Sequence, residues 1–150
     1  MYGRSNAVAS YGRIANAETN PIQQIVMLYE GAIKFIRLAA IDIESGDLAA
    51  KGEHSNRALD IINYLQSILD FERGGEVATT LDALYGNVTL ILLGASAKLD
   101  AGEMRRAADL LVPVRDAWAV NAAPPSPVTS NVPLHLADAG QSAMSYQFSA

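Results

Sequence analysis

Two histidines are the side chains of this sequence best suited to holding a metal ion or carrying a phosphoryl group. His54 directly follows Glu53, and adjacent side chains leave a helix about 100° apart, so this pair cannot share one ion. Phosphotransfer bundles usually place a lysine and a glycine shortly after their histidine, whereas Ser, Asn and Arg follow His54. His135 has no partner residues near it in the sequence. We predict an ordinary exposed His54 and no metal site.

The sequence also lacks the residues that other catalytic mechanisms require. The chain has no cysteine, which excludes thiolate metal sites, cysteine nucleophiles and disulfides. It has no glycine-rich phosphate loop and no nucleophile elbow, and its carboxylates are scattered along the chain rather than paired. The sequence therefore predicts a protein that is not an enzyme and that needs no cofactor.

The charge distribution argues against nucleic acid as a partner. The net charge is -5, and residues 21–120 contain nine Lys or Arg against fourteen Asp or Glu. Binding to nucleic acid requires a basic stripe that displaces counterions, and the only adjacent basic pair is Arg105 with Arg106. The chain also lacks a signal-peptide pattern and a run of eighteen uninterrupted apolar residues. We expect a cytoplasmic protein without membrane insertion.

Apolar residues recur with helical spacing in four segments, which predicts an all-α, antiparallel up-down-up-down four-helix bundle. Asn20 and Pro21 are suited to begin the first helix, since Asn caps free backbone donors and Pro lacks one. This helix should run to about Glu44. Gly46 then ends it in the left-handed conformation, and Asp47 caps the second helix.

The third and fourth helices are predicted from two turns and an internal proline. A turn at residues 72–75 should separate the second helix from a third that begins near Glu76. After a turn at residues 99–102, the fourth helix contains Pro113. A proline inside a helix removes one hydrogen bond and costs about 3 kcal/mol, so we expect a kink there.

The chain divides into three regions. Residues 1–20 are small and polar, and we expect a flexible lid segment anchored by Tyr11 and Ile14. Residues 21–120 form the bundle, and residues 121–150 are a Pro-, Ser- and Ala-rich tail that we predict to be mostly disordered. One hypothesis is that this tail visits an empty groove as an internal substitute for a hydrophobic partner. Its alternating apolar residues are Val132, Leu134, Leu136, Met144, Tyr146 and Phe148.

The first and third helices carry more apolar residues than one core-facing stripe requires. We expect the surplus faces to be partly exposed and to form a groove for an amphipathic or extended segment of a partner. The glycine on the first helix would let either a partner backbone or a neighbouring helix approach closely. The predicted client-binding residues here are Met27, Leu28, Gly31, Phe35, Leu38, Leu90 and Leu93.

Three blocks resemble the flagellar export chaperone FliS family. Residues 27–33 read MLYEGAI, which is similar to the family signature MLYDGA. Residues 81–85 supply Leu-x-x-Leu-Tyr after a Gly-Gly-Glu turn, and residues 110–118 supply Leu-Leu-x-x-x-Arg-x-Ala-Trp. Together the blocks cover about residues 11–119 in the family's order and spacing.

The resemblance implies a partner and a role. In this family a four-helix bundle binds the C-terminal segment of flagellin, which is disordered in the free subunit and helical in the filament. Covering that segment prevents premature polymerisation and keeps the subunit competent for the flagellar type III export apparatus. A tyrosine of the family's N-terminal segment, matched here by Tyr11, partly covers the client site. Export-apparatus components or a flagellar regulator are further implied partners.

The sequence also departs from the family pattern. Gly86 and Asn87 stand where the family has an acidic-aromatic pair, and Ser96 stands where it has an asparagine. Two alternatives therefore stay open, namely a chaperone for another secreted client and a bundle that buries its surplus stripe against its own copy. We expect a monomer or a weak homodimer.

Overall fold

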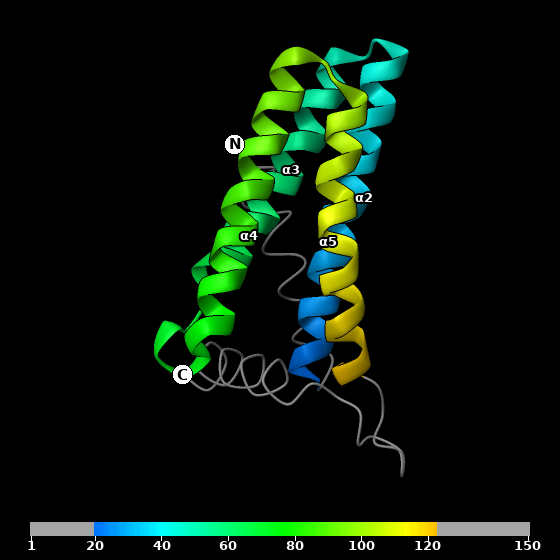
Figure 1. The fold of residues 1–150 in the computed structure, drawn as a ribbon. Helices are drawn as coiled ribbons and strands as arrows, with labels where there is room; N and C mark the ends of the chain where they lie inside the picture. Colours follow the sequence, from blue (N-terminus) through cyan, green and yellow to red (C-terminus); the bar gives the residue numbers. More distant parts are fainter. Residues whose placement is uncertain (1–19, 123–150) are drawn as a thin grey trace.

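A computed structural model describes residues 20–122, which form four α-helices. They are α2 (Pro21–Ser45), α3 (Leu48–Ser67), α4 (Phe71–Lys98) and α5 (Ala101–Ala122). Short connections reverse the chain after each helix, so that successive helices run antiparallel (Figure 1). The predicted all-α, up-down-up-down bundle is confirmed for these residues. The predicted lid and tail lie outside the described residues except at their inner ends: Asn20 caps α2, and residues 121–122, predicted as the start of the tail, are the last two of α5.

Local capping chemistry sets the ends of the first two helices. The side-chain oxygen of Asn20 accepts hydrogen bonds from the backbone N–H groups of Ile22 and Gln23, at 3.0 and 3.3 Å. Gly46 ends α2 with a φ of 77°, a left-handed conformation that glycine adopts without a steric penalty. Asp47 accepts from the backbone N–H of Ala50 at 3.1 Å and so caps α3. All three predicted caps are confirmed.

The helices form a ring in which each contacts the next, and α5 closes the ring on α2. The contacts of α2 with α3 and α5 are more extensive than those of α4 with the same two neighbours. As a result, 13 of the 25 residues of α2 are buried, against 6 of the 28 residues of α4. The largest fully buried side chains are Tyr29, Ile36, Ile61, Ile62, Leu65, Tyr85, Val88, Leu92, Met104 and Leu111.

The start of α4 differs from the prediction. Asp70 accepts from the backbone N–H groups of Glu72 and Arg73, both at 3.1 Å, and this cap begins the helix at Phe71. The expected open turn is therefore one helical turn followed by a break at Gly75, whose φ is 52°. The sequence indicated the break correctly, but it did not reveal that Asp70 would cap a helical turn before it.

The predicted kink at Pro113 is not found. α5 runs without interruption from Ala101 to Ala122 with Pro113 inside it, and Figure 1 shows no sharp bend along it. Proline removes the backbone donor that would reach the carbonyl of Asp109, and its ring crowds that carbonyl, yet the helix continues past it. Leu111 and Trp118 are buried on either side of it, at 0% and 3% exposure, and their packing holds the helix on one path.

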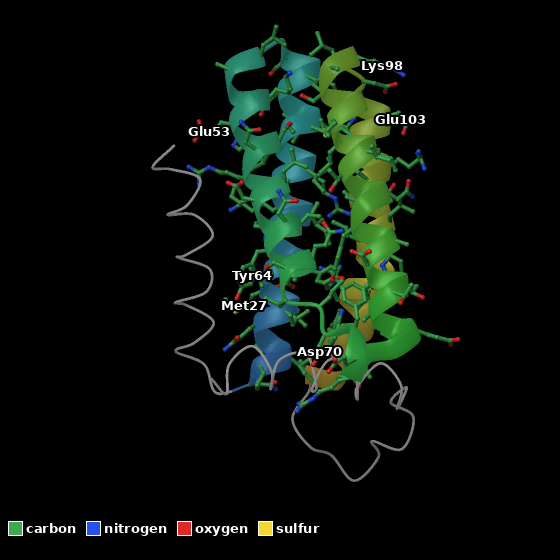
Figure 2. The ribbon with its side chains drawn as sticks, turned by 90° about the vertical axis from the view of Figure 1, so that its left-hand side faces the viewer. Met27, Glu53, Tyr64, Asp70, Lys98 and Glu103 are labelled. Atoms are coloured by element: carbon green, nitrogen blue, oxygen red, sulfur yellow. The ribbon has the colours of Figure 1, made fainter. Side chains whose placement is uncertain are left out.

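The two ends of the described chain meet at one pole of the bundle. The side-chain amide of Asn20 donates to the backbone carbonyl of Ala122 at 3.1 Å. In Figure 2, Asp70 lies at this end, while Lys98 and Glu103 lie at the opposite end, beside the turn between α4 and α5. The first and last described residues, 20 and 122, therefore lie side by side.

Candidate functional site

The two tyrosines of the sequence blocks meet in the core. Tyr29 of α2 and Tyr85 of α4 are 0% and 2% exposed, and their hydroxyl oxygens lie 2.7 Å apart. Their rings pack at a tilt of 50° with centroids 6.2 Å apart. Burial raises the pKa of both phenols well above the ordinary range, so both stay neutral and share one hydrogen bond. These motif residues hold the bundle together rather than face a partner.

The first and third blocks also meet. A guanidinium nitrogen of Arg115 lies 3.7 Å from a carboxylate oxygen of Glu30, which joins α5 to α2 at the surface. The same guanidinium bonds Asp116 at 2.7 Å. Exposed ion pairs of this kind contribute at most about 1 kcal/mol. Since Trp118 of the third block is buried as well, the three blocks define one packed region across α2, α4 and α5.

The predicted exposure of the second stripe of α2 is wrong at two of its main residues. Leu28 is 3% exposed and Phe35 is 9% exposed, so neither is open to a partner. Gly31 is buried too, while Met27 and Leu38 are half-buried. The physical reason is that α2 is covered from two sides, because α3 and α5 both pack closely against it. Tyr11 and Ile14, the predicted lid residues, lie outside the described residues.

His54 is not the free surface residue that we predicted. Its Nδ1 lies 2.5 Å from a carboxylate oxygen of Asp42, and its side chain is 26% exposed. The imidazole stacks on Phe35 with ring centroids 6.0 Å apart, and the guanidinium of Arg57 lies 5.7 Å from the same phenyl centroid. The histidine thus covers Phe35 and links α3 to α2. Among residues 20–122, no group of three or more His, Asp or Glu side chains could hold a metal ion.

The outer face of α4 is apolar and open. Leu90 is 71% exposed and Leu93 is 52% exposed, as predicted for the third helix. No charged residue occurs from residue 83 to residue 97. At Gly86 and Gly94 an added Cβ would meet no atom within 4 Å, so packing inside the bundle does not explain either glycine. Glycine costs a helix about 1 kcal/mol relative to alanine. The presence of two glycines on this face therefore needs another explanation.

A hollow continues this face toward α5. It has a volume of about 280 Å³ and lies between α4 and the start of α5. Its lining combines apolar residues of α4 with charged residues of both signs, two of which, Lys98 and Glu103, are labelled in Figure 2. The residues that line the hollow are Leu90, Ile91, Gly94, Ala95, Lys98, Asp100, Glu103 and Arg106. Sequence reasoning identified Leu90 here but not the charged residues, whose placement depends on how α5 turns back.

The length and composition of α4 would also allow it to cross a membrane. An 18-residue window in it has a mean hydropathy of 1.4, and 28% of that window is buried. A core helix of a soluble bundle meets the same criteria, and α4 packs against both α3 and α5. We therefore attribute its hydropathy to a buried stripe and an exposed apolar face on the same helix.

One departure from the family pattern is accommodated by the packing. The ammonium group of Lys51 donates to the hydroxyl oxygen of Ser96 at 3.1 Å and to its backbone carbonyl at 3.3 Å. Ser96 therefore joins α4 to α3 near one end of the bundle. The other departure, at Gly86 and Asn87, falls on the outer side of α4, where the two residues are half-buried and exposed.

The fold and this surface define a four-helix bundle whose distinctive site is an apolar helix face rather than a catalytic centre. A family model described as flagellar protein FliS matches residues 4–124. The chain belongs to this family, the flagellar secretion chaperones.

Curated relatives agree with that assignment. The flagellar secretion chaperone FliS of Salmonella typhimurium is 37% identical over 123 residues, which cover 79% of this chain and 90% of the relative. The FliS of Bacillus subtilis is 33% identical over 75% of this chain and 84% of its own length. The FliS of Vibrio cholerae is 31% identical over 66% and 73%, respectively.

Proposed function

We propose that this chain binds the C-terminal segment of flagellin in the cytoplasm, prevents its premature polymerisation and presents it to the flagellar type III export apparatus. No bond is made or broken in this role. The observation that carries the proposal is the uncharged outer face of α4, with Leu90 71% and Leu93 52% exposed, in a member of the FliS family. A contiguous apolar face on a soluble protein usually marks the site of a partner.

The free energies set the size of the surface required. Ordering a disordered segment on binding costs about 2–5 kcal/mol of the gross interaction energy. Burying one exposed leucine contributes at most about 1.5–3 kcal/mol, so Leu90 and Leu93 together offset the ordering cost and little more. The half-buried Met27 and Leu38 on α2 are the further predicted contacts that supply the surplus. A client that reaches both helices would have to wrap around the bundle.

The N-terminal segment would regulate this surface. We propose that Tyr11 and Ile14 act as a lid, as the family resemblance implies, which lowers the apparent affinity by the fraction of time that the lid is closed. Export-apparatus components and a flagellar regulator are the further partners that we propose, because a bound client must be handed over and released.

The test is isothermal titration of the full chain with the C-terminal segment of flagellin from the same organism. The informative variant is Leu93→Asp, and its control is Val120→Asp on α5, which places the same charge at nearly the same exposure, 52% against 54%, away from every proposed client contact. Phe35 is unsuitable for this purpose because it is buried against His54. We expect tight one-to-one binding with a negative heat-capacity change, weakened by Leu93→Asp and kept by Val120→Asp.

Three results would contradict the proposal in whole or in part. Binding of equal strength in both variants would remove α4 from the client site. No heat at high concentration, together with concentration-dependent self-association that Leu93→Asp abolishes, would assign the face to a second copy of the chain. Binding to an unrelated secreted protein, but not to flagellin, would keep the chaperone class and change the client.

A further inference from the structure

The chain beyond α5 has the composition of a ligand for an apolar surface. In residues 123–150 the only Asp, Glu, Lys or Arg is Asp138. The family match ends at residue 124, so the role of this segment does not follow from the family. Two stretches alternate apolar residues with others, and alternation places the apolar side chains of an extended chain on one side. They are Val132, Leu134, Leu136 and Met144, Tyr146, Phe148.

We propose that residues 132–136 of the same chain lie along the outer face of α4 and cover Leu90 and Leu93. The segment would then act as an internal ligand of this face. This inference does not depend on which client the protein carries.

The segment leaves the bundle at a place from which it reaches this face. α5 runs antiparallel to α4 and ends at Ala122, at the pole opposite the turn between the two helices. Leu90 is nine residues before that turn, so it lies level with about the ninth residue of α5, roughly 20 Å along the axis from Ala122. The ten residues from 123 to 132 span up to about 33 Å when extended. Val132 can therefore stand beside Leu90 without straining the chain.

The two surfaces are chemically matched. Residues 83–97 of α4 and residues 123–137 both lack acidic and basic residues other than His135, so neither surface has to desolvate an ion pair when they meet. Gly86 and Gly94 leave room for the backbone of an extended segment to approach the helix closely. The prolines at 124, 125, 127 and 133 favour an extended segment and reduce the entropy lost on docking.

A spin label can test this contact in the full chain. Because the sequence has no cysteine, Ser130→Cys provides a single site for a nitroxide. We expect the label to broaden the backbone amide signals of residues 86–97 and to spare those of Glu53 and Arg57 on the outer side of α3. Adding Leu134→Asp to the labelled chain should restore the signals. Adding Ser126→Asp should not, because it adds the same charge without removing an apolar contact.

Each alternative occupant has its own signature. Broadening spread evenly over the bundle, or centred on α3, would overturn the proposal. Broadening that appears only when a labelled chain is mixed with an isotope-labelled, unmodified chain would assign the contact to a second copy and would overturn it as well. The measurement on the free protein tests whether residues 132–136 contact α4 of the same chain. The effect of an added flagellin segment on the broadening tests the proposed function separately.

Discussion

Helices α2 and α4 are both long and rich in apolar residues, yet the bundle uses them differently. α2 buries 13 of 25 residues, including three alanines with no exposed surface, and both α3 and α5 pack extensively against it. α4 buries 6 of 28 residues and leaves two leucines more than half exposed. Apolar content therefore tells how much surface must be covered, whereas the neighbours of a helix decide whether the same chain or a partner covers it.

The strongest test of this comparison is the same kind of truncation on each helix. Ile36→Ala on α2 removes side-chain atoms from a site with 0% exposure and should lower the free energy of unfolding by about 2–5 kcal/mol. Leu90→Ala on α4 should lower it by no more than about 1 kcal/mol, because Leu90 is 71% exposed within the described bundle and loses only the proposed contact with residues 132–136. Chemical denaturation of the full chain measures both values. Equal losses would mean that the face of α4 is covered in the free protein more completely than its exposure indicates.

The second test addresses the hydroxyl contact between Tyr29 and Tyr85, which joins the two helices in the core. Tyr85→Phe removes a hydroxyl and leaves that of Tyr29 buried without its partner, so the free energy of unfolding should fall by about 1–3 kcal/mol. The double variant with Tyr29→Phe should lose less than the sum of the two single changes, because no orphaned hydroxyl remains. Additive losses in this double-mutant cycle would argue against a shared hydrogen bond.

The same pair predicts sensitivity to high pH. Burial raises the pKa of both tyrosines in the folded state, so their contribution to stability is fully present below the unfolded pKa of about 10 and is lost as the pH rises above it. The loss should be on the order of 1 kcal/mol for each pH unit and each tyrosine. The tyrosinate absorbance of this pair, taken as the difference between the parent and the double phenylalanine variant, should appear together with the loss of helical circular dichroism. The double phenylalanine variant should unfold at higher pH than the parent.

The smallest effect compares two glycines of α4. Gly86→Ala meets no atom within 4 Å and should raise the free energy of unfolding by about 0.5–1 kcal/mol. At Gly74 an added Cβ would lie 2.8 Å from the Cβ of Ala78, so Gly74→Ala should not stabilise the protein. Thermal unfolding distinguishes the two variants. If Gly86→Ala stabilises the bundle and also weakens flagellin binding, the glycine serves the surface and not the fold.

Features that depend on neighbouring residues in the sequence were predictable. The caps at Asn20 and Asp47 and the left-handed Gly46 follow from the chemistry of one or two side chains, and all are found as expected. The kink at Pro113 was expected on equally local grounds and is absent. The reason is not local, because buried contacts from α2 and α4 hold both halves of α5 in line.

The candidate surface was predictable only in part. Periodicity detects a second apolar stripe on α2 and another on α4, but it cannot tell which stripe the ring of helices will cover. Leu28 and Phe35 were therefore misplaced, whereas Leu90 and Leu93 are exposed as expected. His54 was missed for a related reason. Its partner Asp42 lies on the other arm of the α2–α3 hairpin, and only the register of that hairpin brings the two side chains together.

The hydrogen bond between Asn20 and Ala122 has a mechanical consequence. Because both ends of the bundle are at one pole, a force that pulls residues 20 and 122 apart acts across the α2–α5 contact rather than along the helix axes. Such a load separates the two helices one turn at a time, starting from the loaded end. The contacts of the core are therefore broken in sequence and not all together. The bundle, whose most extensive contacts are those of α2, should therefore yield to a small force applied at its ends.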